Sequence, residues 1–181
     1  EVTVDYRQIK PVKSYPYPWP FYPFFDAFPE AIYMNGCEVE AFDDLADDYD
    51  LIVLGYTVWF LSPSIPVTGF MQSEQAKQIF KDKPVVTLIA CRDMWVMAQE
   101  KMKKLISDLG ATLIDNVVLT DQGGSIYAFA TTPRWLLTGK KDAFWFFPPA
   151  GVSDEEIQKS SRFGRRMLEA LKNDEEKKKE P

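Results

Sequence analysis

The chain has 181 residues, of which 46% are hydrophobic and 27% charged, and its net charge is −6. This size and balance are typical of one folded domain with a substantial core. The acidic charge and the lack of a basic stripe exclude nucleic-acid binding, which needs clustered Lys and Arg. The chain contains no histidine, which excludes Ser-His-Asp and Cys-His catalysis and His-ligated metals. We therefore expect no metal site.

The cysteine count and the hydropathy pattern indicate a compartment. Cys37 and Cys91 lie far apart in the sequence and do not form a disulfide framework. No apolar run approaches the roughly 20 residues that span a bilayer, and no signal peptide is visible. We expect a cytoplasmic protein without an integral membrane segment.

The first elements in chain order are a short strand and an aromatic loop. Residues 2–4 alternate β-branched and polar side chains, which predicts a strand. Residues 15–29 contain eight aromatic residues and five prolines. Proline removes backbone donors, so this segment is predicted to be an extended loop rather than a helix or a central strand.

Three predicted strands follow. The first is a continuous apolar run, which is typical of a parallel strand buried on both faces, and the next two are also interpreted as buried strands. They lie at residues 51–56, 84–90 and 111–119. Helical spacing between and after them predicts helices at residues 66–80, 94–109 and 154–172.

Local signals mark the ends of these helices. Pro66 suits a first helical turn, and Asp93 is a plausible N-cap. Gly110 is the expected helix stop. The stretch from Ser153 to Glu156 has a capping-box pattern. We expect the chain beyond Asn173 to be a disordered charged tail.

The alternation of strand and helix predicts an α/β fold with a parallel sheet and right-handed crossovers. Ligands of such sheets bind beyond the carboxyl ends of the strands. The loops at residues 57–66, at residues 91–95 and from residue 120 onward are therefore the candidate binding loops.

The first of these loops contains Thr57, Val58 and Trp59, followed by Phe60 and Leu61. It resembles the flavin loop of flavodoxin-like quinone and FMN reductases, which carry Pro-Val-Trp and a Ser/Pro-rich stretch; Thr57 replaces the usual proline. The resemblance implies that these five residues contact FMN. Trp59 would then stack on the isoalloxazine ring, with ~0.5–1.5 kcal/mol beyond burial. The alternative is that Trp59 and Phe60 cap the core.

The second loop comprises Cys91, Arg92, Asp93, Met94 and Trp95. In the flavodoxin-like resemblance it corresponds to the second flavin loop, so these residues are also predicted to bind the cofactor. Arg92 would balance a reduced flavin anion, or alternatively form a surface ion pair. Cys91 is better explained as a small strand-end residue than as a nucleophile, because no histidine activates it.

The chain departs from the flavodoxin-like pattern at its N-terminal side. No Ser/Thr-rich phosphate loop occurs before residue 51. The usual strand order, 2-1-3-4-5, places a strand between residues 2–4 and residues 51–56. We expect that this first strand and its helix are missing from the sequence and that the flavodoxin-like three-layer sandwich has a gap there.

Two aromatic insertions, at residues 15–29 and 123–149, set the chain apart from a plain flavodoxin within a single domain over residues 1–172. One explanation is local packing or a homodimer interface. The other is a lipophilic tunnel over the flavin, with Trp59, Trp95 and Tyr127 near its floor and Tyr127 or Asp121 abstracting a proton.

Residues 91–100 and 131–141 resemble a narrower group, the dialkylresorcinol condensing enzymes or aromatases. That resemblance implies oxidation of a dialkyl cyclohexanedione to an aromatic resorcinol, with flavin accepting hydride. Three hypotheses stay open: a flavin-dependent oxidoreductase on a lipophilic cyclic ketone or quinone-like substrate, an electron-transfer flavodoxin, and a flavin-free protein-interaction module.

Overall fold

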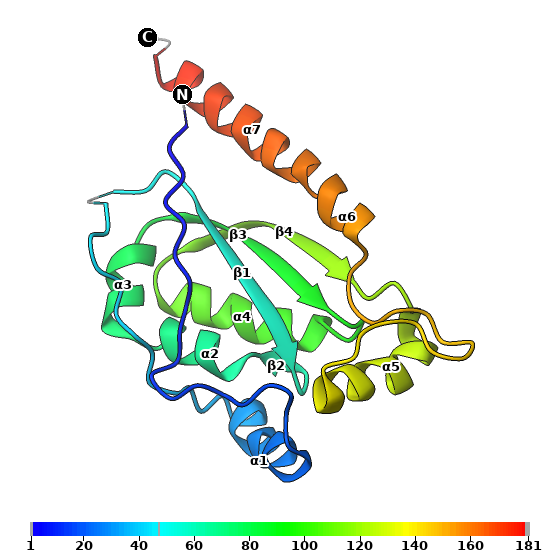
Figure 1. Ribbon diagram of the computed structural model, residues 1–181. Coiled ribbons are helices and arrows are strands. Elements are labelled where there is room, and N and C mark those ends of the chain that lie inside the picture. The colour runs from blue at the N-terminus through cyan, green and yellow to red at the C-terminus, as the bar shows by residue number, and fades with distance from the viewer. Residues whose placement is uncertain (1, 47, 180–181) are drawn as a thin grey trace.

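A computed structural model describes residues 2–46 and 48–179 (Figure 1). The strands are β1 (Ile52–Trp59), β2 (Ser62–Pro63), β3 (Pro84–Cys91) and β4 (Thr112–Thr120). The helices are α1 (Phe21–Ile32), α2 (Ile65–Met71), α3 (Glu74–Phe80), α4 (Val96–Asp108), α5 (Gly124–Thr138), α6 (Asp154–Lys159) and α7 (Ser161–Lys179).

The four strands form one sheet in the order β2-β1-β3-β4. β1, β3 and β4 are parallel, whereas β2 returns antiparallel along the end of β1. The α/β class and the three predicted strands are thus confirmed. Thr57 is in register with Ala90, and Ala90 with Leu119, so the carboxyl ends of the three parallel strands lie side by side. Within the described residues, the outer edge of β1 pairs only near its carboxyl end, with β2 at Val58 and Trp59 and through the Thr57 carbonyl, which accepts from the Ser64 amide at 3.0 Å.

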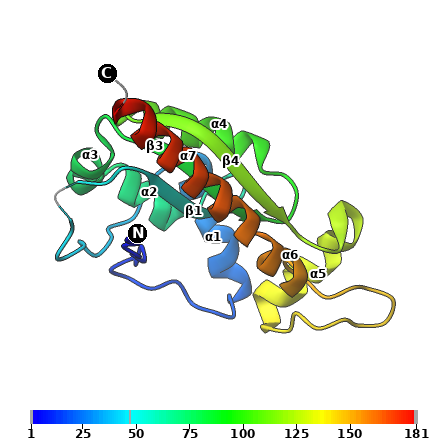
Figure 2. The ribbon, with the colours of Figure 1, turned by 90° about the horizontal axis from the view of Figure 1, so that it is seen from above.

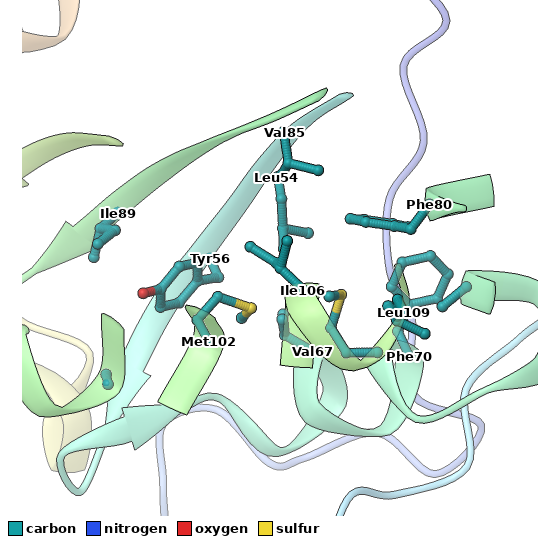
Figure 3. Close-up of a cluster of buried hydrophobic side chains, with 13 residues drawn as sticks. Leu54, Tyr56, Val67, Phe70, Phe80, Val85, Ile89, Met102, Ile106 and Leu109 are labelled. Atoms are coloured by element: carbon teal, nitrogen blue, oxygen red, sulfur yellow. The ribbon is translucent and has the colours of Figure 1, made fainter. Parts of the chain in front are cut away.

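A hydrophobic cluster, here called the sheet core, fills the space between the sheet and helices α2, α3 and α4 (Figure 3). Alternation along β1 places Leu54 and Tyr56 on the same face of the sheet. Met102 and Ile106, four residues apart on α4, meet them from the helix side. The buried members of the sheet core are Leu54, Tyr56, Val67, Phe70, Met71, Ala76, Phe80, Val85, Ile89, Ala98, Met102, Ile106 and Leu109.

One hydrogen-bonded network of side chains crosses the sheet core. The Tyr56 hydroxyl donates to Gln99 Oε1 at 2.7 Å, and Gln99 Nε2 donates to Thr87 Oγ1 at 3.0 Å. All three side chains are buried. Because each buried polar group has a partner, the network fixes α4 on β1 and β3 without an unsatisfied group.

The helix ends differ in detail from the sequence prediction. The predicted helix at residues 66–80 is two helices, because Ser73 accepts a hydrogen bond from the Ala76 amide and starts α3. Asp93 is not an N-cap: α4 begins at Val96 with Trp95 at the cap position. Gly110 ends the helical region with φ of 76°, as predicted. The Ser153 cap is also confirmed, since its side chain accepts from the Glu156 amide.

The C-terminal helical region is divided at Ser160, so that α6 and α7 replace the single predicted helix. α7 runs to Lys179, past Asn173, where the sequence predicts a disordered tail. It lies above the sheet face opposite to α4 (Figures 1 and 2). Val53 and Ile114 stay about half exposed on the sheet, so α7 covers the strands incompletely.

Two predictions at the N-terminal side are wrong. Residues 2–4 are not a strand. The aromatic segment at residues 15–29 is not all loop, because α1 begins at Phe21. Pro20 is the N-cap and Pro23 lies in the first turn, where amide groups have no partner within the helix, so both are tolerated. Only Pro29 lies deeper in the helix, near its end.

No helix in the described part of the chain is long and apolar enough to cross a membrane.

Candidate functional site

The two aromatic insertions meet beside the carboxyl end of β1. The Trp19 amide donates to the Leu136 carbonyl at 2.8 Å, which ties the segment before α1 to α5. Around this bond lies a second cluster, here called the aromatic cluster. Its buried members are Trp19, Ala27, Ala31 and Ile65, and Tyr15, Phe24, Cys37, Trp59, Phe60, Leu136 and Leu137 pack against them partly buried. The insertions therefore cover each other in part.

The β1–β2 hairpin, which carries the first candidate binding loop, has a strained turn. Phe60 and Leu61 form its two-residue connection with φ of 48° and 62°. Such a turn normally takes Asn and Gly, and each residue held at positive φ costs about 1–3 kcal/mol. The Phe60 ring is held by Phe24 and Phe28, with centroid distances of 5.1 and 5.2 Å.

Lys101 of α4 braces the same hairpin from the other side. Its Nζ donates to Ser62 Oγ at 2.6 Å and to the Ile32 carbonyl at 3.3 Å. Ser62 is fully buried, so this Ser–Lys pair links β2 to the end of α1 and does not face a substrate. The hairpin is thus held from two sides in a conformation that its own residues disfavour.

Trp59, the predicted stacking residue, takes part in the aromatic cluster. Its ring lies edge-to-face with Tyr15 at 5.2 Å and with Trp19 at 5.4 Å. It also lines a cavity of about 400 Å³ between β1 and the N-terminal segment. Trp59 therefore combines the two alternatives for this residue: it caps a core, and it presents surface to an open space.

That cavity lies beside the carboxyl end of β1. Residues 10–12 and 38–40 pair antiparallel and form one side of it. The Val12 amide donates to the Glu38 carbonyl at 3.0 Å, and the Glu40 amide donates to the Lys10 carbonyl at 2.8 Å. The lining comprises Gln8, Ile9, Lys10, Pro11, Ser14, Tyr15, Glu40, Trp59 and Pro66. The cavity is a depression that is widely open to solvent rather than an enclosed pocket.

The second candidate loop faces α5 rather than this cavity. Arg92 lies over the Phe129 ring at 4.4 Å, and its Nη2 is 4.0 Å from Met94 Sδ. Met94 is 52% exposed. The carbonyl of Asp93 accepts from the Trp95 amide, and Trp95 packs against the sheet core. Arg92 thus makes a cation–π contact, which neither alternative for this residue anticipated.

Cys91 is shielded at the end of β3. Burial, with a smaller contribution from the Asp93 carboxylate, raises the pKa of the Cys91 thiol to about 11. At neutral pH the sulfur is protonated, and a thiol is a poor nucleophile. This environment agrees with the interpretation of Cys91 as a strand-end residue.

The two candidate catalytic residues have different surroundings. Asp121 is buried, and both its carboxylate oxygens accept backbone amides, Gly123 N at 2.8 Å and Gly151 N at 2.5 Å. It joins the end of β4 to the start of α5 and to the chain that returns from α5. Tyr127 is 43% exposed and lies edge-to-face with Phe147 at 6.0 Å.

The structure brings together some of the predicted residues and separates others. Thr57–Trp59 were expected in a loop but form the end of β1, and Cys91 ends β3; because these strands are adjacent and parallel, the two candidate segments lie at neighbouring strand ends. Of the three residues expected near one cavity floor, Trp59 lines this cavity, whereas Trp95 and Tyr127 do not. The lining residues at 8–11 could not be predicted, because a segment with little periodicity predicts only a loop.

The described residues fit part of FMN. An exposed face of Trp59 and a cavity beside it suit a flat ring, but the polar lining groups are one lysine, one glutamate, Gln8 and Ser14, and no Ser/Thr-rich loop surrounds them. The residues therefore fit the ring system and not the phosphate. Across residues 2–46 and 48–179, no group of three or more metal-ligating side chains that could hold an ion is found.

Comparison with known proteins finds no matching family model, no matching curated protein and no matching solved structure.

Proposed function

We propose that the chain is a flavodoxin-like domain that holds a flavin ring beside the carboxyl ends of β1 and β3 and oxidises a lipophilic ring substrate. The observation that carries the proposal is the strained β1–β2 hairpin, which sets Trp59 against an open cavity at the carboxyl edge of a parallel sheet. This edge is where ligands of such sheets bind, and strain of this kind accumulates at functional sites.

The side chains around the site support a ring-shaped and apolar guest. Tyr15, Trp59 and Pro66 offer flat apolar surface to the cavity. Arg92 supplies a positive charge at the next strand end, and Met94 and Phe129 beside it are 52% and 64% exposed. A bound flavin would supply the hydride chemistry, which protein side chains do not provide.

Asp121 has an organising role in this proposal. Its carboxylate is buried and binds the Gly123 and Gly151 amides, so it holds the backbone beside the site rather than facing a substrate. Tyr127 is exposed and is the better candidate to face one. The finer assignment, aromatisation of a dialkyl cyclohexanedione, rests on the resemblance of residues 91–100 and 131–141 to the dialkylresorcinol enzymes.

A flavin titration tests the proposal. The fluorescence of riboflavin and of FMN should be quenched on binding. The two Kd values should agree within a fewfold, because the described residues contact the ring and not the phosphate. Trp59→Ala should weaken both by about tenfold, the loss of roughly 1.4 kcal/mol of stacking and burial. Trp145→Ala, at a 92% exposed site, is the matched control. Absence of binding at millimolar flavin would reject the flavin proposal.

A flavin-free interaction module is the second candidate. It is favoured by the edge-to-face packing of Trp59 between Tyr15 and Trp19, which occupies part of that ring with protein. This candidate predicts that the chain does not bind flavin. Added flavin should therefore leave the stability of the Trp59→Ala variant unchanged. It also accounts for the exposed aromatic residues of α1 as contacts to a partner or a second copy.

A further inference from the structure

The loop that follows α5 presents two aromatic side chains to solvent. Trp145 is 92% exposed and Phe146 is 73% exposed. The chain has five tryptophans, and the other four are buried or half buried. Figures 1 and 2 show this loop projecting away from the sheet. Since exposure of large apolar side chains is unfavourable, these two residues need an explanation.

The loop is firmly held in this arrangement. The backbones of Phe144 and Phe147 exchange two hydrogen bonds of 3.2 and 2.9 Å, which close a tight turn with Trp145 and Phe146 at its tip. Trp145 adopts a φ of 51°, which is unfavourable for a bulky residue. The Phe144 and Phe147 rings stack beneath the tip at 4.8 Å. A turn of this kind is maintained by its surroundings rather than by local preference.

Arg134 of α5 anchors the base of the loop. Its Nη1 donates to the carbonyls of Lys140 and Asp142, at 3.0 and 2.8 Å, and its Nη2 pairs with the Asp142 carboxylate at 3.1 Å. The guanidinium also lies over the Phe144 ring at 4.5 Å. Arg134 therefore compensates the one acidic side chain of the loop and fixes its backbone.

The charge that remains at the loop is positive. Residues 123–151 contain three basic residues and one acidic residue, in a chain whose net charge is −6. Asp142 pairs with Arg134 and also interacts with Lys140, so this stretch keeps an excess of positive charge, and the side chains of Lys140 and Lys141 are exposed near the aromatic tip. An aromatic tip beside two lysines is complementary to an anionic lipid surface, where Trp sits at the headgroup level and Lys is attracted to lipid phosphates.

We propose that residues 140–147 form a membrane-docking tip, which inserts Trp145 and Phe146 into the interface of an anionic lipid bilayer with Lys140 and Lys141 on the headgroups. This inference rests on the loop alone and does not depend on flavin binding. The contact is peripheral and reversible, because two aromatic side chains and two charges give modest affinity.

Vesicle cosedimentation tests the proposal. The full chain should bind vesicles of phosphatidylcholine with 30% phosphatidylglycerol, chosen as a probe composition of about one-third anionic lipid, and bind pure phosphatidylcholine far less. The W145A/F146A and K140E/K141E variants should each bind the anionic vesicles at least about tenfold more weakly. The matched controls Y6A/Y33A and K81E/K103E change exposed side chains elsewhere and should bind as the unaltered chain does.

The depth to which Trp145 inserts into the bilayer is measured by fluorescence quenching with brominated lipids. Tryptophan emission of the unaltered chain should be quenched on vesicle binding, and Trp145→Phe should lose most of that quenching while still binding. Failure of the unaltered chain to bind anionic vesicles would overturn the proposal. It would also be overturned if both tip variants bound these vesicles as tightly as the unaltered chain does. Sedimentation velocity distinguishes a self-interface: a dimer that W145A/F146A dissociates, without vesicle binding, would also overturn it.

Discussion

The sheet core and the aromatic cluster differ in how completely they are closed. The sheet core lies between three strands and three helices, and its thirteen principal members are all buried. The aromatic cluster has four buried members, and its larger rings, such as Phe24, Trp59 and Phe60, stay partly exposed. The sheet core is enclosed between the sheet and a layer of helices, whereas the aromatic cluster is open on the side where the cavity lies.

The difference has a functional meaning. A closed core tolerates little change in volume, because its side chains touch neighbours in every direction. A cluster that is open on one side can admit a ligand without unfolding the sheet. The predictions below ask whether the two clusters behave as separate units, and they run from the largest expected effect to the smallest.

The largest effect is expected from Phe80→Ala in the sheet core. Phe80 is 1% exposed and packs on Phe70 at 6.2 Å. Its truncation should lower the free energy of unfolding by about 4 kcal/mol, the transfer cost plus a cavity. Urea denaturation measures this, with Phe25→Ala, at a 51% exposed site, as the control. A loss below about 1 kcal/mol would show that the sheet core is less tightly packed than its burial indicates.

Trp19→Ala should have a smaller and more local effect. Trp19 is 8% exposed, and its loss should cost about 3 kcal/mol, at the lower end for a buried aromatic. Amide hydrogen exchange should accelerate in α1 while β3 amides keep their protection, because the aromatic cluster opens without the sheet. Equal acceleration in both would show that the two clusters unfold as one unit.

Gln99→Leu should cost about 1–3 kcal/mol, because it leaves the buried hydroxyls of Tyr56 and Thr87 without their partner. Adding Tyr56→Phe removes one of those orphaned groups, so the double variant should be more stable than the sum of the two single losses predicts. Thermal or urea unfolding of the four species measures the coupling. Strict additivity would contradict the network seen across the sheet core.

The smallest expected effect concerns the two thiols. Cys91 lies beside the sheet core and Cys37 beside the aromatic cluster. Cys91 packs against the sheet core, and its pKa is raised to about 11 from an ordinary value of 9.0. In a Cys37→Ser chain at pH 8, Cys91 should react with maleimide about 100-fold more slowly when folded than in urea, which is the ratio of thiolate fractions.

The same shift sets a pH window for stability. Because the folded-state pKa is the higher one, the contribution of Cys91 is fully present below pH 9 and is lost as the pH rises toward 11. Thiolate absorbance in the folded Cys37→Ser chain should therefore appear near pH 11. A midpoint close to 9 would show that solvent reaches the sulfur freely.

Much of the sheet could be predicted from short patterns. The segments at residues 51–56, 84–90 and 111–119 became β1, β3 and β4 as predicted. The expectation that both faces are buried is wrong for β1 and β4, because exposed positions remain along these strands, among them Val53 and Ile114. Gly110 and Ser153 ended and began helices as expected, since both act through local backbone geometry. Asp93 did not begin a helix as expected, because α4 begins three residues later, at Val96.

The site could be predicted only in part. The placement of two candidate binding loops at adjacent strand ends followed from the parallel sheet. The partners of those loops did not, because they come from distant parts of the chain: Phe129 reaches Arg92 from α5, and Tyr15 reaches Trp59 from before α1. Asp121 showed the same limit, since its amide partner Gly151 lies 30 residues away.

The sequence by itself determined the class of fold, the three parallel strands and the absence of histidine chemistry, because periodicity and composition act over a few residues at a time. Only the tertiary structure decided that residues 21–32 form a helix, that the two aromatic insertions meet, and that Trp145 and Phe146 are exposed at a loop tip. A proline-rich aromatic segment has no decisive local preference, so the surface against which it packs selects its conformation.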